Sequence, residues 1–224
     1  WILWPLKENG PKKLRINKKK FIYLISPNKI KKSFFKDLIE ILKLNKVSFF
    51  LFCFKNLSFK KRFFIGKKTQ KICRKYKTKF LVNDDVMLAK SLNADGCHLG
   101  QKDIKIFRAR KIIPKKIIGI TCHNSKKLAK LAISNKADYL AFGAFYKSKT
   151  KKTKFKANLK LLKEIKKITK TPIVAIGGIN SSNYKKLLLN KANFLAISGY
   201  IWNNKKLKPL EAIKKLKWKL MLEK

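Results

Sequence analysis

Short apolar runs and longer segments with helical spacing alternate along this chain. Residues 21–26 form a continuous apolar run, as expected of a buried parallel strand. Residues 31–44 instead carry Phe34, Leu38 and Ile41 at helical spacing. We expect strands at 21–26, 47–54, 80–83, 96–99, 117–121, 139–143, 173–177 and 194–198. We expect helices at 31–44, 59–76, 85–93, 104–112, 125–135, 157–168, 181–190 and 207–222.

Strict alternation of this kind favours a parallel sheet with right-handed crossovers. Eight strand–helix units in 224 residues favour a closed (β/α)₈ TIM barrel, an α/β fold with an eight-stranded parallel core, over an open sheet. We expect one barrel domain over residues 21–224. Residues 1–20 are interpreted as a basic N-terminal extension that could be mobile. Neither a Gly-x-Gly-x-x-Gly after the first strand nor a P-loop occurs, which disfavours nucleotide-binding folds.

The chain is very basic, with 58 Lys and Arg residues against 11 Asp and Glu residues and a net charge of +47. Lysines are spread over nearly every expected helix and loop, which favours solvated helix faces over a specific nucleic-acid site. No apolar run is long enough to cross a bilayer. The four cysteines (Cys53, Cys73, Cys97 and Cys122) form no C-x-x-C pair, so we expect a reduced, cytoplasmic protein.

Carboxylates follow two successive expected strands in this acid-poor chain. Asp84 and Asp85 come after the strand at 80–83, and Asp103 comes shortly after the strand at 96–99. Mg²⁺ is usually held by one or two carboxylates together with substrate phosphates, so Asp84 and Asp103 are candidate ligands of a shared Mg²⁺. The alternative is that these residues only cap the helices that follow.

Other polar groups at the expected strand ends suit phosphorylated substrates. The loop Ser148-Lys-Thr150-Lys151 offers hydroxyl and ammonium donors for a polyphosphate. Gly177-Gly178, together with Ser198-Gly199, forms the expected phosphate cradle of the seventh and eighth strands. Two phosphate sites beside a Mg²⁺ site indicate displacement of pyrophosphate, whose charge Mg²⁺ and Lys neutralise.

The two histidines, His98 and His123, have different expected roles. His98 belongs to the end of a buried strand and is interpreted as structural. His123, at the end of the fifth strand, could transfer protons. Neither histidine has the neighbours that a zinc site requires.

Together these motifs resemble the thiamine-phosphate synthase family and its thiazole tautomerase relatives. The resemblance covers about residues 21–220. The matching motifs are Leu81-Val-Asn-Asp, Ala94-Asp-Gly-Cys-His-Leu-Gly-Gln-Lys-Asp, Ile118-Gly-Ile-Thr-Cys-His, Ala137-Asp-Tyr-Leu-Ala-Phe-Gly, Ser148-Lys-Thr-Lys, Pro172-Ile-Val-Ala-Ile-Gly-Gly-Ile and Ala196-Ile-Ser-Gly. The resemblance implies a (β/α)₈ barrel. It also implies joining of hydroxymethylpyrimidine diphosphate to thiazole phosphate, giving thiamine phosphate and pyrophosphate.

The resemblance assigns roles to individual residues. It implies that Asp84 and Asp103 hold Mg²⁺. The residues implied to bind the diphosphate are Asn83 and a catalytic set formed by Lys55, Thr121 and Lys151. Ser148 and Thr150 would contact the substrates, and the backbone donors to the thiazole phosphate would be Gly178, Ile197 and Ser198. The partners implied are small molecules only, and a homo-oligomer is compatible with the sequence.

The chain departs from the family pattern in its second strand. Leu51 and Cys53 stand where a Gln and an Arg are usual, and Asp85 stands where an Arg is common. An Arg grips a diphosphate through a planar fork that Cys cannot replace. One alternative is therefore a thiazole tautomerase with His123 as acid and base, or a weakened synthase. A more distant alternative is a basic binding protein without catalysis.

Overall fold

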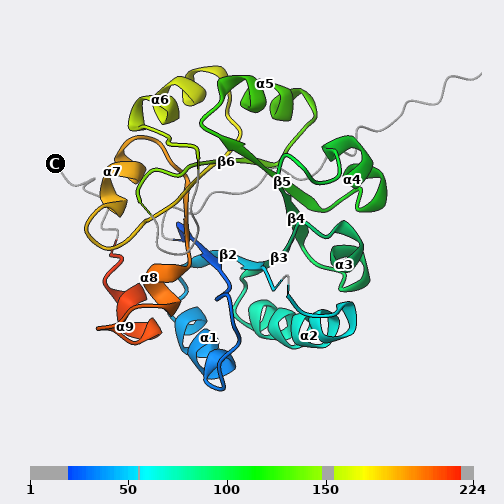
Figure 1. Cartoon of the computed structure of the whole chain (residues 1–224), viewed down its shortest axis with the longest axis vertical. Helices are drawn as coiled ribbons and strands as arrows, with labels where there is room; N and C mark the ends of the chain where they lie inside the picture. Colours follow the sequence, from blue (N-terminus) through cyan, green and yellow to red (C-terminus); the bar gives the residue numbers. More distant parts are fainter. Residues whose placement is uncertain (1–19, 55, 148–153, 218–224) are drawn as a thin grey trace, which may run out of the picture.

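Eight parallel strands close into a barrel in sequence order, β1-β2-β3-β4-β5-β6-β7-β8. The structure is a computed structural model that describes residues 20–54, 56–147 and 154–217. The strands are β1 Ile22–Ile25, β2 Val47–Phe52, β3 Lys79–Asn83, β4 Gly96–Leu99, β5 Ile117–His123, β6 Tyr139–Phe142, β7 Ile173–Ile176 and β8 Phe194–Ile197. The view along the barrel confirms the expected TIM-barrel fold (Figure 1).

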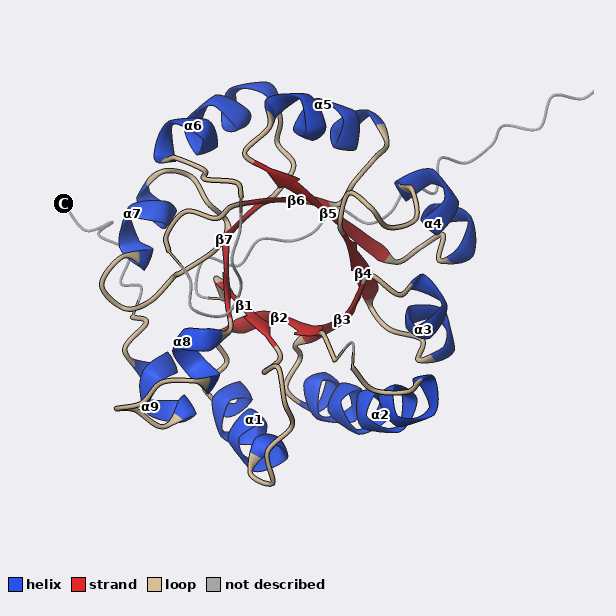
Figure 2. Ribbon diagram, viewed as in Figure 1, coloured by secondary structure: helices blue, strands red, loops and turns tan. Residues whose placement is uncertain are grey.

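Helices surround the strands as an outer ring (Figure 2). They are α1 Phe34–Lys43, α2 Phe59–Lys75, α3 Val86–Ser91, α4 Ile106–Ile112, α5 Lys126–Ser134, α6 Leu159–Ile168, α7 Tyr184–Leu189, α8 Gly199–Trp202 and α9 Pro209–Lys214. Each of the first seven lies between consecutive strands, as the alternation in the sequence predicts.

Several element boundaries differ from the sequence expectation. The strand expected at 47–54 ends at Phe52, whereas the strand expected at 117–121 continues to His123. A short helix, α8, was not expected, and the helix expected at 207–222 is shorter as α9, Pro209–Lys214. Pro209 at the first turn fixes the start of α9, because proline suits that position. Residues 1–19 lie outside the described residues, so the division at residue 20 stays a prediction.

Two apolar layers follow from the alternation of side chains along each strand. Tyr23, Phe49 and Leu51 point into the barrel, where they pack with Tyr139 and Phe194. The residues between them on each strand point outward and pack under the helices. The interior layer fills the barrel, so chemistry is confined to its ends.

Gly66 lies inside α2 without interrupting it. A Cβ at this position would lie 2.7 Å from Cδ1 of Leu92, so the glycine allows the helix to approach the end of α3 closely. Ser58 caps the start of α2 by accepting a hydrogen bond from the N–H of Lys61.

Across residues 20–54, 56–147 and 154–217, no helix combines the length and apolar character needed to span a membrane.

Candidate active site

The turn after β3 directs Asp84 toward the barrel mouth. Asp84 adopts a left-handed backbone conformation with φ of 64°, which Asp tolerates better than most residues. Its N–H donates to the carbonyl of His98 on β4 at 2.7 Å, and the N–H of Asp85 donates to the carbonyl of Asn83 at 2.8 Å. These two hydrogen bonds fix the turn, so Asp84 occupies a strained position of the kind often found at functional sites.

Asp103 lies in the loop between β4 and α4 and is held by the backbone of that loop. Its Oδ2 accepts a hydrogen bond from the N–H of Gly100 at 2.6 Å. A Cβ on Gly100 would lie 3.1 Å from this oxygen, so glycine permits the close approach. Asp103 does not cap α4, because the N-cap residue of that helix is Lys105. The cap interpretation is therefore wrong for Asp103.

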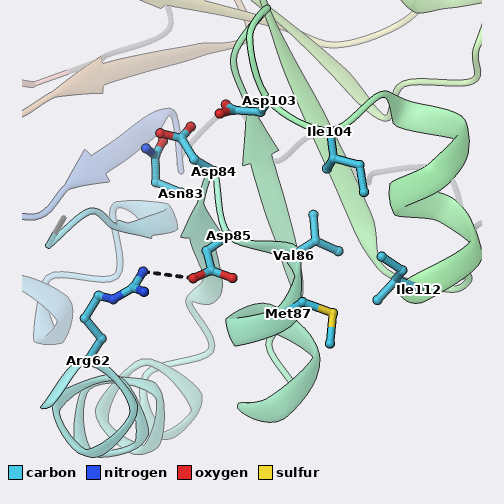
Figure 3. A pocket seen from close by; sticks show the side chains of 9 residues that line it. All are labelled: Arg62, Asn83, Asp84, Asp85, Val86, Met87, Asp103, Ile104 and Ile112. Atoms are coloured by element: carbon cyan, nitrogen blue, oxygen red, sulfur yellow. Dashed lines mark ion pairs between the residues drawn. The ribbon is translucent and has the colours of Figure 1, made fainter. Parts of the chain in front are cut away.

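Asp84 and Asp103 line one pocket of about 470 Å³ at the mouth. Figure 3 shows their carboxylates facing one another, with the side chain of Asn83 beside Asp84. The other lining residues are Arg62, Asp85, Val86, Met87, Ile104 and Ile112. The two strand-end carboxylates are therefore brought together, as the spacing in the sequence predicts.

Asp85 has a structural role that separates it from the other two aspartates. Its Oδ1 accepts from the N–H of Leu88 at 2.9 Å and caps α3, which confirms the cap interpretation for this residue. Its Oδ2 forms an ion pair of 2.9 Å with Nη1 of Arg62 on α2 (Figure 3). Both oxygens of Asp85 are thus engaged in contacts that hold α2 and α3, although this residue also lines the pocket.

The donor set in this pocket suits a hard divalent cation. The carboxylates of Asp84 and Asp103 and the amide oxygen of Asn83 are oxygen ligands, which Mg²⁺ prefers. Within the described part of the chain, no group of three or more His, Cys, Asp or Glu side chains is arranged to hold a metal ion together. Mg²⁺ usually keeps several waters and uses substrate phosphates as further ligands, so two carboxylates fit this ion.

Thr121 on β5 is connected to the barrel interior through His98. Its Oγ1 lies 2.9 Å from Nε2 of His98, whose Nδ1 lies 2.9 Å from the hydroxyl of Tyr139. The rings of His98 and Tyr139 stack with centroids 5.6 Å apart. Desolvation lowers the pKa of His98 to about 4, although Asp103 opposes this shift. The interpretation of His98 as a structural, hydrogen-bonded residue agrees with these contacts.

On the β7–β8 side of the mouth, backbone groups replace polar side chains. Gly177 and Gly178 have positive φ values of 104° and 62°. A Cβ on Gly178 would lie 2.4 Å from the carbonyl oxygen of Lys147, so only glycine fits. The amide of Asn183 donates to the carbonyl of Gly178 at 3.0 Å and braces this turn.

Ile197 and Ser198 lie at the end of β8. The side chain of Ile197 is buried in the core between the barrel and the helices, so only the backbone of this residue could contact a ligand. Ser198 is the N-cap residue of α8, and its hydroxyl donates to the carbonyl of Ser26 at 3.1 Å. The Ser198 hydroxyl is therefore used to join β8 to the end of β1.

Four of the expected site residues, Lys55, Ser148, Thr150 and Lys151, lie outside the described residues, so their roles stay predictions. The two residues of the family pattern that precede Lys55, Leu51 and Cys53, are described. Leu51 points into the barrel core and is buried, and the N–H of Cys53 donates to the hydroxyl of Ser26 at 3.0 Å. The position of the usual Gln is thus filled by core packing.

His123, the candidate acid and base of the alternative reaction, stacks on Phe155 with ring centroids 4.0 Å apart. It has a positive φ of 52° at the end of β5, after an irregular pairing with β6.

Sequence reasoning missed three residues that shape this region. Arg62 pairs with Asp85, and Tyr23 and Tyr139 extend the hydrogen-bonded group of His98. Tyrosines inside apolar strands were a usable signal, because a buried tyrosine hydroxyl usually finds a partner. Arg62 gave no comparable signal, since its partner lies in another strand–helix unit.

Comparison with known proteins agrees with the motifs. The model of the thiamine monophosphate synthase family matches residues 22–201. A thiamine-phosphate synthase of Pelagibacter ubique is 66% identical over 207 residues, covering 92% of this chain and 100% of that protein. A thiamine-phosphate synthase of Erythrobacter litoralis is 38% identical and covers 81% of this chain and 88% of that protein.

Among solved structures, thiamine phosphate pyrophosphorylase from Pyrococcus furiosus superposes with a TM-score of 0.79 at 28% identity. The match covers 89% of this chain and 94% of that one. The fold, the motifs and these relatives agree, and the family predicted from the sequence is confirmed. The chain belongs to the thiamine monophosphate synthase family.

Proposed function

We propose that this protein acts as a thiamine-phosphate synthase. It joins 4-amino-2-methyl-5-hydroxymethylpyrimidine diphosphate to 4-methyl-5-(2-phosphoethyl)-thiazole, giving thiamine phosphate and pyrophosphate. The observation that supports this most strongly is the pair Asp84 and Asp103, which face one another in one pocket (Figure 3). The names of the relatives point to the same transferase reaction.

Asp84 and Asp103 would hold Mg²⁺, with Asn83 beside them. Bound there, Mg²⁺ would neutralise the negative charge of the diphosphate as it becomes a leaving group. The N–H of Gly100 holds the carboxylate of Asp103, and the hydrogen bonds of the turn after β3 hold the backbone of Asp84.

Asn83 and Thr121 would position the diphosphate through hydrogen bonds from the amide and the hydroxyl. Lys55 and Lys151 would add positive charge, and Ser148 and Thr150 would contact the substrates from the loop after β6. The carbon–oxygen bond to the diphosphate breaks, and pyrophosphate leaves with the electron pair. The lone pair of the thiazole nitrogen then forms the new carbon–nitrogen bond.

The thiazole phosphate would bind on the opposite side of the mouth, at the backbone of Gly178, Ile197 and Ser198. Among the residues that the structure describes, no group accepts a hydrogen bond from the N–H of Gly178. The turn needs glycine at this position, because a Cβ would meet the carbonyl oxygens of Lys147 and Tyr146 at 2.4 Å and 2.7 Å. The four free cysteines fit a reducing compartment, so a cytoplasmic location is part of the proposal.

The reaction can be tested with the purified chain, both substrates and Mg²⁺, by following pyrophosphate release. We expect release that requires the thiazole and is lost in Asp84→Asn. The matched control is Asp85→Asn, which keeps a helix-capping side chain next to the altered position. Tautomerisation of the thiazole without pyrophosphate release would favour the tautomerase instead. Salt-sensitive binding to DNA without chemistry would favour a basic binding protein.

A further inference from the structure

Four side chains inside the barrel form a continuous series of hydrogen bonds that ends at Thr121. The hydroxyls of Tyr23 and Tyr139 are 2.7 Å apart, and the Tyr139 hydroxyl is 2.9 Å from Nδ1 of His98. Nε2 of His98 is 2.9 Å from Oγ1 of Thr121. The four residues come from β1, β6, β4 and β5, so the closed barrel alone brings them together.

The surrounding packing holds these four side chains in place. A Cβ on Gly119 would lie 1.8 Å from Cζ of Tyr139, so the ring occupies space that only a glycine leaves free. The amide of Gln101 donates to the carbonyl of Thr121 and fixes the backbone of that residue. Tyr23 and Tyr139 are 2% and 0% exposed, so their hydroxyls depend on partners within the protein.

The hydrogen bonds along these four side chains can run in two directions. In the first, Tyr23 donates to Tyr139, Tyr139 donates to Nδ1 of His98, and Nε2–H donates to Thr121. In the second, Thr121 donates to Nε2, Nδ1–H donates to Tyr139, and Tyr139 donates to Tyr23. The second direction leaves the buried O–H of Tyr23 without an acceptor among the described residues. An unsatisfied buried donor is costly, so the first direction is favoured.

The first direction has a consequence at the mouth. The oxygen of Thr121 accepts from His98, and its own proton has no acceptor among the described side chains and backbone groups. The hydroxyl is then preset to donate to an incoming oxygen acceptor. Phosphoryl oxygens are such acceptors, and they offer no proton in return.

We propose that Tyr23, Tyr139 and His98 are positioning residues that fix the Thr121 hydroxyl as a hydrogen-bond donor toward an anionic oxygen of the substrate. The identity of that oxygen, in the diphosphate, rests on the proposed function. The direction of the hydrogen bonds does not rest on the proposed function, because it is a property of the protein without substrate.

The tautomer of His98 tests the direction of the hydrogen bonds between Tyr23 and Thr121. The protein has only two histidines, so ¹⁵N labelling of histidine and long-range ¹H–¹⁵N correlation give two ring patterns, and His123→Gln assigns them. We expect His98 in the substrate-free protein to carry its proton on Nε2. A proton on Nδ1, or on both nitrogens at pH 7, would overturn the proposal. This result stands even if the protein shows no synthase activity.

A double-mutant cycle tests whether Tyr139 acts through Thr121. Thr121→Val removes the hydroxyl, and Tyr139→Phe removes the partner of His98. We expect each to lower kcat/KM for the pyrimidine diphosphate about tenfold or more, and the double variant to be no worse than Thr121→Val. Losses that multiply in the double variant would contradict positioning through Thr121.

Tyr184→Phe is the matched control for this cycle. Tyr184 is also 2% exposed, and its hydroxyl donates to the carbonyl of Lys217 at 2.5 Å, outside the chain described above. It should lose stability but keep the His98 tautomer and kcat/KM. A change in the tautomer in this variant would mean that general loosening of the barrel, rather than the loss of a specific partner, controls His98.

Discussion

The two sides of the barrel mouth are built from different parts of the polypeptide. On the β3–β4–β5 side, the groups proposed to carry the chemistry are side chains, namely those of Asn83, Asp84, Asp103 and Thr121. On the β7–β8 side the proposed phosphate contacts come from the backbone around Gly178 and Ser198, and a Cβ on Gly178 would collide with the neighbouring loop. A site made of side chains can lose function while keeping its fold. A site made of backbone changes only when the fold around it changes.

The largest effect is expected from Asp103→Asn, on the side-chain half of the mouth. Asn has nearly the same size and can still accept from the N–H of Gly100, but it has no charge with which to bind Mg²⁺. Loss of metal-assisted charge neutralisation should lower kcat by about 100-fold or more. Steady-state pyrophosphate release measures the loss, and an unchanged Tm shows that the fold is kept. Near-normal turnover would remove Asp103 from the proposed metal site.

The side-chain half should also respond to pH through His98. Its pKa is lowered to about 4 in the fold from an ordinary value of 6.5, so the unfolded chain binds more protons between these values. The free energy of unfolding should therefore fall as pH drops from 6.5 to 4, by roughly 3 kcal/mol from this residue. Urea unfolding of the wild type and of His98→Gln, both without Mg²⁺, isolates the contribution. Equal losses in the two proteins would show that other groups cause the acid sensitivity.

On the backbone half, Gly178→Ala should affect stability and phosphate binding together. The added Cβ meets carbonyl oxygens of Tyr146 and Lys147 at 2.7 Å and 2.4 Å, at a φ of 62° that disfavours side chains. We expect a loss of about 1–3 kcal/mol in the free energy of unfolding and a higher KM for the thiazole phosphate. Ser182→Ala, an exposed change in the same loop, is the control. A raised KM without any loss of stability would break the distinction between the two halves.

The smallest effect is expected at Asp85, which lies in the side-chain half but has a structural role. Asp85→Ala removes the cap of α3 and the ion pair with Arg62, which should lower stability by about 1 kcal/mol. Turnover should change less than about threefold, because Asp84 and Asp103 are untouched. Thermal unfolding and the pyrophosphate assay measure the two effects. A large loss of turnover with intact stability would place Asp85 among the catalytic groups.

Much of the site was predictable because the strands of a barrel end at one face. Once the strands at 80–83 and 96–99 were recognised, Asp84 and Asp103 were expected at the same mouth, and they line one pocket. The sequence could not separate a cap from a candidate ligand. That distinction depended on which backbone N–H each carboxylate meets, and the caps proved right for Asp85 and wrong for Asp103.

Element ends were less predictable than element order. β2 stops at Phe52 and β5 continues to His123, because strand ends depend on pairing with neighbours rather than on apolar runs. The short helix α8 follows directly from β8 and had no apolar period of its own to reveal it.

The sequence by itself determined the repeat of strands and helices, and with it the barrel, the family and the positions of the strand-end aspartates. Periodicity is local, and it survives in the linear chain. Only the tertiary structure decided that Arg62 pairs with Asp85 and that Tyr23, Tyr139, His98 and Thr121 form one connected chain. Those contacts join residues up to 116 positions apart, and closure of the barrel sets their distances.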